Sequence, residues 1–133
     1  MPERYTELDV PFSTADTEGK AEIAFRDFRL AVVFKDWRNV ATRVVFDEVA
    51  AFRWDDNYLC ICDVAPDRVY EIEESSWMAA LRDAGRLGSP ARHVHYRLYF
   101  NSEASALDVV ATSMKPEPIQ STTDNSGAAP RRV

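Results

Sequence analysis

Alternation of apolar and polar residues in short segments is the feature that most constrains this fold. In residues 28–34 the side chains of Phe28, Leu30, Val32 and Phe34 share one face, and residues 40–46 repeat the pattern after a turn at 35–39. A period of two is typical of half-buried strands, and short connections favour antiparallel pairing. Further strands are expected at 49–54, 58–62, 68–72, 93–100 and 106–111. We therefore predict one strongly bent antiparallel sheet of six or seven strands, built as a β-meander and a C-terminal hairpin.

One short helix is expected after the meander. Ser75 or Ser76 can cap its N-terminus, Trp77 begins an apolar stripe at helical spacing that continues through Ala80, Leu81 and Ala84, and Gly85 or Gly88 can end it. A helix of this length is marginal alone, so the Trp77 stripe is expected to lie on the sheet and to join the core. The fold class is therefore α+β.

The chain has 133 residues, of which 46% are hydrophobic, which suits one domain with a single core. Residues 1–20 contain few periodic apolar side chains and predict a flexible arm. Residues 115–133 hold three of the seven prolines and almost nothing to bury, which predicts a disordered tail. The folded α+β domain is expected over 21–114.

The formal net charge of -6 argues against a nucleic-acid binder, which needs clustered Lys and Arg. Residues 47–74 hold nine acidic and two basic side chains, so their net charge is 2 - 9 = -7, and the flanking segments are close to balanced. An acidic surface steers a basic partner toward it. Our candidate partner-binding residues are Asp47, Glu48, Asp55 and Asp56 at strand ends, with Trp37 in the first hairpin turn. The plainer alternative is a solubilising surface without a partner.

A second candidate site is a polar cluster on the outer face of the C-terminal hairpin. His95, Arg97 and Tyr99 share a face of one strand, and Asp108 lies on the next. Two registers are possible, with either Arg97 or Tyr99 opposite Asp108. A His oriented by a carboxylate can do acid–base chemistry. No nucleophile elbow, phosphate loop or H-E-x-x-H motif accompanies the cluster, so solvated cross-strand pairing is the plainer interpretation.

We predict no cofactor and no metal. Cys60 and Cys62 are too close along a strand for an unstrained disulfide and read as free thiols, and His93 with His95 supplies too few ligands for a closed site. The sequence contains no signal-like leader and no apolar run of membrane-spanning length, which predicts a cytoplasmic protein without membrane contact.

Several segments together resemble small uncharacterised bacterial α+β proteins. They are Phe46-Asp-Glu-Val49 and Phe52-Arg-Trp54 in the meander, Ser75-Ser-Trp77 opening the helix, and the closing hairpin from His95-Tyr-Arg-Leu98 to Leu107-Asp-Val-Val110. Some proteins of this appearance are immunity proteins, which neutralise polymorphic toxins by binding them. The resemblance implies a protein-binding role and transfers no functional residue.

Our leading interpretation is a non-enzymatic domain that binds another protein with a basic surface, such as a toxin domain, through its acidic face. One alternative is a small-molecule-binding or hydrolytic domain that uses the His95, Arg97, Tyr99 and Asp108 face. Another is a structural homodimer that pairs sheet edges.

Overall fold

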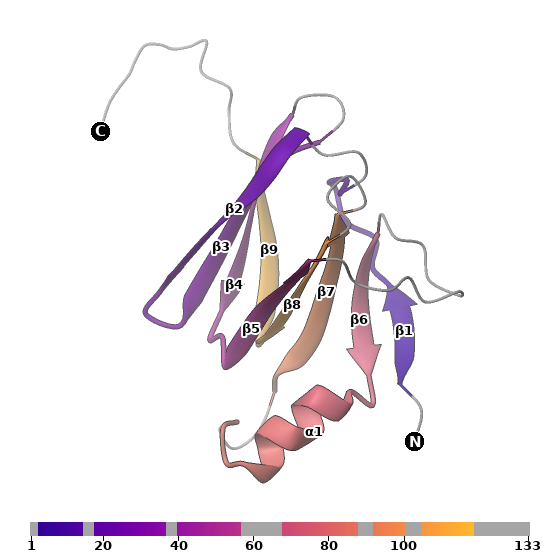
Figure 1. Cartoon of the computed structure of the whole chain (residues 1–133), viewed down its shortest axis with the longest axis vertical. Coiled ribbons are helices and arrows are strands. Elements are labelled where there is room, and N and C mark those ends of the chain that lie inside the picture. The colour runs from indigo at the N-terminus through magenta and orange to yellow at the C-terminus, as the bar shows by residue number, and fades with distance from the viewer. Residues whose placement is uncertain are drawn as a thin grey trace.

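The computed structural model describes residues 3–14, 18–36, 40–56, 68–87, 92–100 and 105–118. These residues form two antiparallel sheets and one helix, whose arrangement can be followed in Figure 1. The first sheet has the order β1 (Arg4–Glu7), β6 (Val69–Glu73), β7 (Val94–Phe100), β8 (Ser105–Ala111), β5 (Ala51–Asp56). The second has the order β2 (Glu18–Arg26), β3 (Arg29–Lys35), β4 (Ala41–Asp47), β9 (Ser113–Pro118). The α+β class is confirmed, with the sheets dominant.

The prediction of one bent sheet is wrong, because the chain changes sheets three times, between β1 and β2, between β4 and β5, and between β8 and β9. After β4, Glu48 adopts a positive φ of 51° and the chain passes from the second sheet to β5 of the first. After β8, Thr112 alone separates that strand from β9, which pairs with β4 in the second sheet. Alternation identifies the buried face of each strand but does not say which sheet the strand joins.

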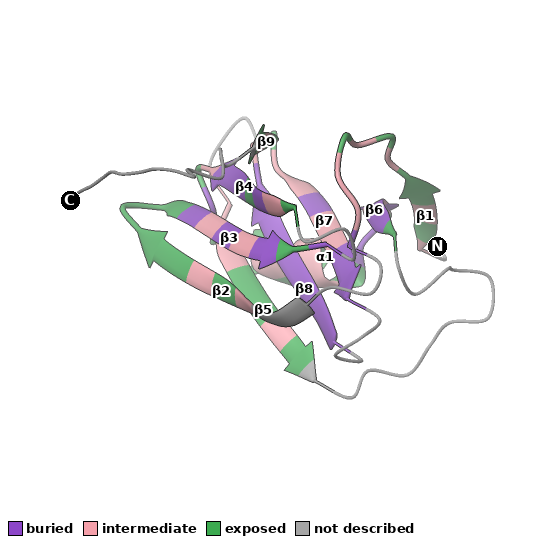
Figure 2. Cartoon of the chain, turned by 90° about the horizontal axis from the view of Figure 1, so that it is seen from above, coloured by how far each residue is buried: buried purple, intermediate pink, exposed green. Residues whose placement is uncertain are grey.

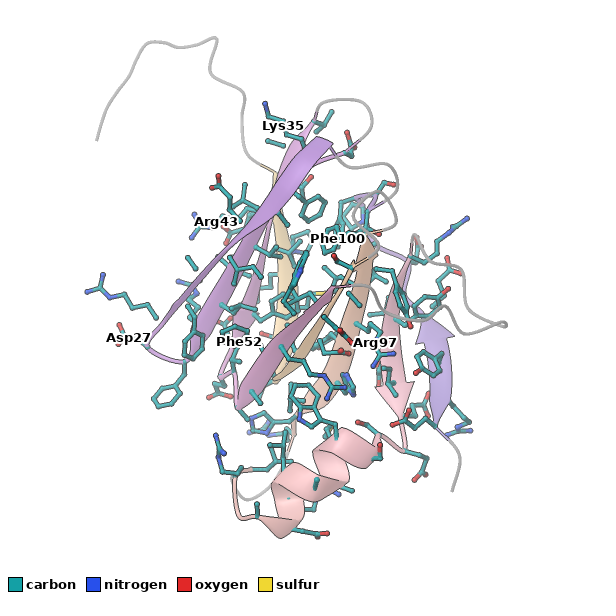
Figure 3. All side chains as sticks on the ribbon, viewed as in Figure 1. Asp27, Lys35, Arg43, Phe52, Arg97 and Phe100 are labelled. Atoms are coloured by element: carbon teal, nitrogen blue, oxygen red, sulfur yellow. The ribbon has the colours of Figure 1, made fainter. Side chains whose placement is uncertain are left out.

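The apolar core lies between the two sheets. β3 contributes Leu30, Val32 and Phe34, and β7 contributes Leu98 and Phe100. The Phe100 ring lies 5.2 Å from that of Phe34 in an edge-to-face contact and 5.5 Å from that of Trp54 in a stacked one. Phe100, labelled in Figure 3, therefore joins aromatic side chains of β3 and β5 in the centre of the molecule.

Parts of the expected arm and tail are strands, which corrects both expectations for those residues. β1 pairs with β6, and Leu8, Val10 and Phe12 pack against the core. At the other end, β9 pairs with β4 across residues 113–118. Its prolines fit because β9 is the edge strand of its sheet, where a missing N–H leaves no ladder bond unmade. Residues 119–133 of the expected tail, and the strand expected at 58–62, lie outside the described residues.

The helix α1 (Ser76–Asp83) lies across the end of the first sheet, below β6 and β7 in Figure 1. Ser75 caps it, as predicted, because its side chain accepts a hydrogen bond from the Met78 N–H at 3.1 Å. No residue of α1 is buried. The expectation that Trp77 belongs to the apolar core is wrong, since its ring packs on the polar side chains of His95 and Arg53.

Candidate functional site

A buried carboxylate organises the outer face of the first sheet. Asp108 on β8 is 2% exposed and stands directly opposite Arg97 on β7, so the first of the two predicted registers is correct. Its Oδ1 accepts from Arg97 Nε at 2.6 Å, and its Oδ2 accepts from Arg53 Nε on β5 at 3.3 Å. Charge-assisted hydrogen bonds of this kind are the strongest that side chains form.

His95 and Ser75 extend this network toward α1. His95 Nε2 lies 2.6 Å from Asp108 Oδ1, and His95 Nδ1 lies 2.7 Å from Ser75 Oγ. An ionised carboxylate only accepts hydrogen bonds, so Nε2 carries the hydrogen. In the neutral imidazole Nδ1 is then the acceptor, and the Ser75 hydroxyl donates to it. We call Ser75, His95 and Asp108 the relay.

Aromatic rings enclose the relay and its arginines. Arg97 Nη1 donates to the hydroxyls of Tyr5 at 3.0 Å and Tyr99 at 3.1 Å, and the Trp77 ring meets the His95 ring edge-on at 5.2 Å. Arg53 lies over the Trp77 ring, 4.3 Å from its centroid. Such cation–π contacts stabilise a charge as water is removed from it.

The predicted grouping of His95, Arg97, Tyr99 and Asp108 on one face is correct, but their predicted exposure to solvent is wrong. His95, Tyr99 and Asp108 are buried and Arg97 is mostly covered. The cover comes from Tyr5 of β1, in the expected arm, and from Trp77 of α1, in the expected core. The sequence pattern carries no signal that brings Tyr5 or Arg53 to this site, and it indicates Ser75 only as a helix cap.

Burial and hydrogen bonding shift the pKa values of Asp108, Arg97 and Tyr99. Burial by itself raises the pKa of Asp108, but hydrogen bonds from His95 and Arg97 and the positive charge of Arg97 outweigh it, so the pKa is lowered overall. Burial lowers the pKa of Arg97, yet its contacts with Asp108 dominate and raise it. Burial also raises the pKa of the Tyr99 hydroxyl, although Arg97 opposes this shift. Asp108 is therefore an anion and Arg97 a cation at neutral pH.

These shifts predict how the relay stabilises the fold at different pH. The pKa of Asp108 is lower in the folded chain than its ordinary value of 3.8, so its ionised form favours folding. This contribution is complete above pH 3.8 and is lost as the pH falls through the lower folded value. We expect the free energy of unfolding of wild type to exceed that of Asp108→Asn by a constant amount near neutrality, and the gap to shrink in acid. Urea titrations from pH 7 to pH 2 measure it, and a gap that widened in acid would contradict the pKa direction.

A cavity of about 470 Å³ meets the relay at its Ser75 end. Ser75 and His95 line it, whereas Arg97, Tyr99 and Asp108 do not. The other lining residues are Glu71, Ile72, Glu73, Glu74, Ser76, Met78, Ala79, Arg82 and Val94. The relay therefore runs from an open cavity into the buried face of the sheet.

The four acidic candidates form two separate groups. Asp47 ends β4 and Glu48 follows it, whereas Asp55 and Asp56 lie at the far end of β5, about 13 Å from its first residue, Ala51, at ~3.3 Å per residue. Asp47 pairs with Arg29 at 3.2 Å, and Asp55 is exposed. Trp37 lies outside the described residues, as do Cys60 and Cys62.

Three phenylalanines lie beside Asp47 and Glu48. Phe28 is 71% exposed, Phe25 46% and Phe52 37%, and the rings of Phe25 and Phe52 are 5.0 Å apart. We call Phe25, Phe28 and Phe52 the phenylalanine surface. Figure 3 shows Asp27 at the tip of the β2–β3 hairpin and Phe52 near it on β5, and in Figure 2 most of the described part of β2, residues 21–26, is exposed. The Phe28 carbonyl accepts from the Val49 N–H at 2.7 Å, which ties this tip to the turn that contains Glu48.

The alternation that placed Phe28 in a strand was misleading. Asp27 and Phe28 form the two-residue turn between β2 and β3, with φ of 54° and 61°. Turns of this shape favour Asn-Gly or Asp-Gly, so Asp-Phe gives little signal of a turn. The short spacing between two alternating runs is the only cue that the sequence offers here.

No family model, curated protein or solved structure compared with the chain matches it. In the described ranges no three His, Cys, Asp or Glu side chains are grouped so as to hold a metal ion. Across the same part of the chain, no helix has the length and apolar character needed to cross a membrane.

Proposed function

We propose that the protein binds another protein through the phenylalanine surface and the acidic residues beside it, Asp27 and Glu48. The observation that carries the proposal is Phe28, whose large apolar side chain is 71% exposed at the tip of a tight turn. Apolar side chains grouped on an otherwise polar surface are typical of interaction sites.

Backbone geometry supports the same proposal. Phe28 has a φ of 61°, in the left-handed region that glycine adopts without strain. For other residues this conformation costs about 1–2 kcal/mol. Because the Phe28 ring is mostly exposed in the free protein, burial of the ring offsets little of that cost. A bulky aromatic residue at such a position is explained most simply by contacts that it makes in a complex.

Charge suggests the chemistry of the partner. Asp27 is almost fully exposed and Glu48 is exposed, so two carboxylates flank the phenylalanine surface, with Asp47 held by Arg29. A partner with an apolar groove bordered by basic residues fits this arrangement. A toxin domain neutralised by this protein is the partner class that we propose, because the resemblance to immunity proteins points in that direction.

The test places a photo-crosslinking phenylalanine analogue at position 28 in the native host. We expect a covalent adduct with one partner protein, identified by mass spectrometry, and none from the same analogue at Val40, which is 45% exposed on the loop before β4. With that partner purified, Phe28→Gly is expected to lower the affinity by about 30-fold or more, because central aromatic residues contribute about 2 kcal/mol or more to binding. The glycine also relieves the backbone strain, so lost binding cannot be ascribed to a less stable fold.

Three outcomes would contradict the proposal. One is equal crosslinking from positions 28 and 40, and another is an affinity that Phe28→Gly leaves unchanged. The third is an adduct of twice the mass of the chain, which would instead indicate a homodimer formed through this surface.

A further inference from the structure

We propose that Ser75 is an activated nucleophile and that the relay hydrolyses neutral carboxylic esters with short apolar acyl chains. This inference goes beyond the binding role and uses none of its residues. It departs from the preference for a non-enzymatic protein that the sequence alone gave.

The relay has the order of hydrogen bonds that activates a hydroxyl. Ser75 Oγ is 2.7 Å from His95 Nδ1, and His95 Nε2 is 2.6 Å from Asp108 Oδ1. Asp108 fixes the tautomer in which Nδ1 is free to accept the hydroxyl proton. Asp108 is itself held by Arg97 and Arg53, and Trp77 packs edge-on against the imidazole ring. The base therefore has a fixed orientation.

The local fold also places Ser75 in the lining of the cavity. Ser75 follows Glu74, whose φ is 59°, at a sharp turn from β6 into α1. One lone pair of Oγ accepts from the Met78 N–H at 3.1 Å, which leaves the other for attack. The oxygen sits at the N-terminal end of α1, where the helix dipole favours developing negative charge.

The chemistry balances without a cofactor. Ser75 Oγ bonds to the carbonyl carbon of the ester while its proton passes to His95 Nδ1 and the carbonyl π electrons move to oxygen. When the carbonyl re-forms, the carbon–oxygen bond to the alcohol breaks and the alcohol leaves with the proton from Nδ1. Water then repeats these steps on the acyl-serine, which releases the carboxylic acid and restores the Ser75 hydroxyl.

The cavity lining indicates the substrate class. Ile72, Met78 and Val94 give it an apolar part that suits a short acyl chain. Glu71, Glu73 and Glu74 outnumber Arg82 in the same lining, which disfavours an anionic substrate.

The experiment treats the whole chain with a neutral alkyl fluorophosphonate and measures its intact mass. Attack by Ser75 forms a serine–phosphorus bond and releases fluoride, so we expect one adduct per chain and a peptide map that places it at Ser75. Ser75→Asn keeps a residue that caps helices well but removes the nucleophile, so it is expected to fold and to stay unlabelled. The matched control is Ser113→Ala, which removes a serine hydroxyl on β9, outside the cavity lining, and is expected to label like wild type.

Turnover provides the second measurement. We expect wild type to hydrolyse p-nitrophenyl butyrate at least about 100-fold faster than Ser75→Asn, the usual lower bound for a positioned base. Folded wild type that stays unlabelled, or an adduct mapped to another residue, would overturn the proposal. So would equal hydrolysis by wild type and Ser75→Asn. None of these results would bear on crosslinking from Phe28.

Discussion

Replacing Asp108 with Ala is expected to lower the free energy of unfolding by about 3–5 kcal/mol, because it leaves buried charge without its partner. The Arg97 side chain is only 15% exposed and His95 is 1% exposed, so neither regains full hydration in the folded variant. Domains of this kind are stable by about 5–15 kcal/mol, so the loss is a large share of the total. Urea denaturation at pH 7, followed by tryptophan fluorescence, measures it.

The matched control for that experiment is Asp55→Ala, the same substitution at an exposed position of β5. It is expected to change the free energy of unfolding by less than about 0.5 kcal/mol, as surface substitutions usually do. A similar small effect for Asp108→Ala would mean that solvent reaches Arg97 and His95 in the folded protein and that the network around Asp108 is not buried.

Replacing Phe100 with Ala is expected to cost about 3–5 kcal/mol by a different mechanism. Phe100 is fully buried, and its ring contacts Phe34 of the second sheet and Trp54 of the first. Removing it leaves a cavity in the centre of the core that these rings cannot fill without moving. The thermal unfolding midpoint and the urea midpoint are both expected to fall sharply.

Phe28→Ala provides the comparison for the same chemical change at the surface. Because Phe28 is 71% exposed, its loss is expected to leave the free energy of unfolding nearly unchanged. If Phe28→Ala destabilised the chain as much as Phe100→Ala, the ring would stabilise the free fold, and its exposure would no longer indicate a partner.

Sequence alternation predicted the members of the polar cluster well but not their burial. A period of two places His95, Arg97 and Tyr99 on one face of any strand. Both hairpin registers that bury the apolar residues also place Asp108 on that face. Whether that face meets water depends on β1 and α1, which lie far away in the sequence. The arm that carries Tyr5 has no periodic pattern of its own, so its pairing with β6 could not be foreseen.

The phenylalanine surface was missed for a local reason. Phe28 continues the apolar alternation of Leu30 and Val32 at the point where the chain turns, so the pattern predicts a strand residue where the structure has a turn residue. The division into two sheets was missed because Thr112 and Glu48 carry no recognised signal for a change of sheet. The cap at Ser75 was predictable, since a serine directly before a helical apolar stripe is a common start signal.

Two of the three places where the chain changes sheets, after β4 and after β8, lie at one corner of the molecule. Thr112 N–H donates to the Asp47 carbonyl at 3.0 Å, and Ala50 N–H donates to the Val110 carbonyl at 2.8 Å. The edge strand β5 of the first sheet continues from β4, an inner strand of the second, and the edge strand β9 of the second sheet continues from β8, an inner strand of the first. Loss of the hydrogen-bond ladder in one sheet therefore disrupts the ladder of the other. We expect the molecule to unfold cooperatively, in a single transition without a half-folded state.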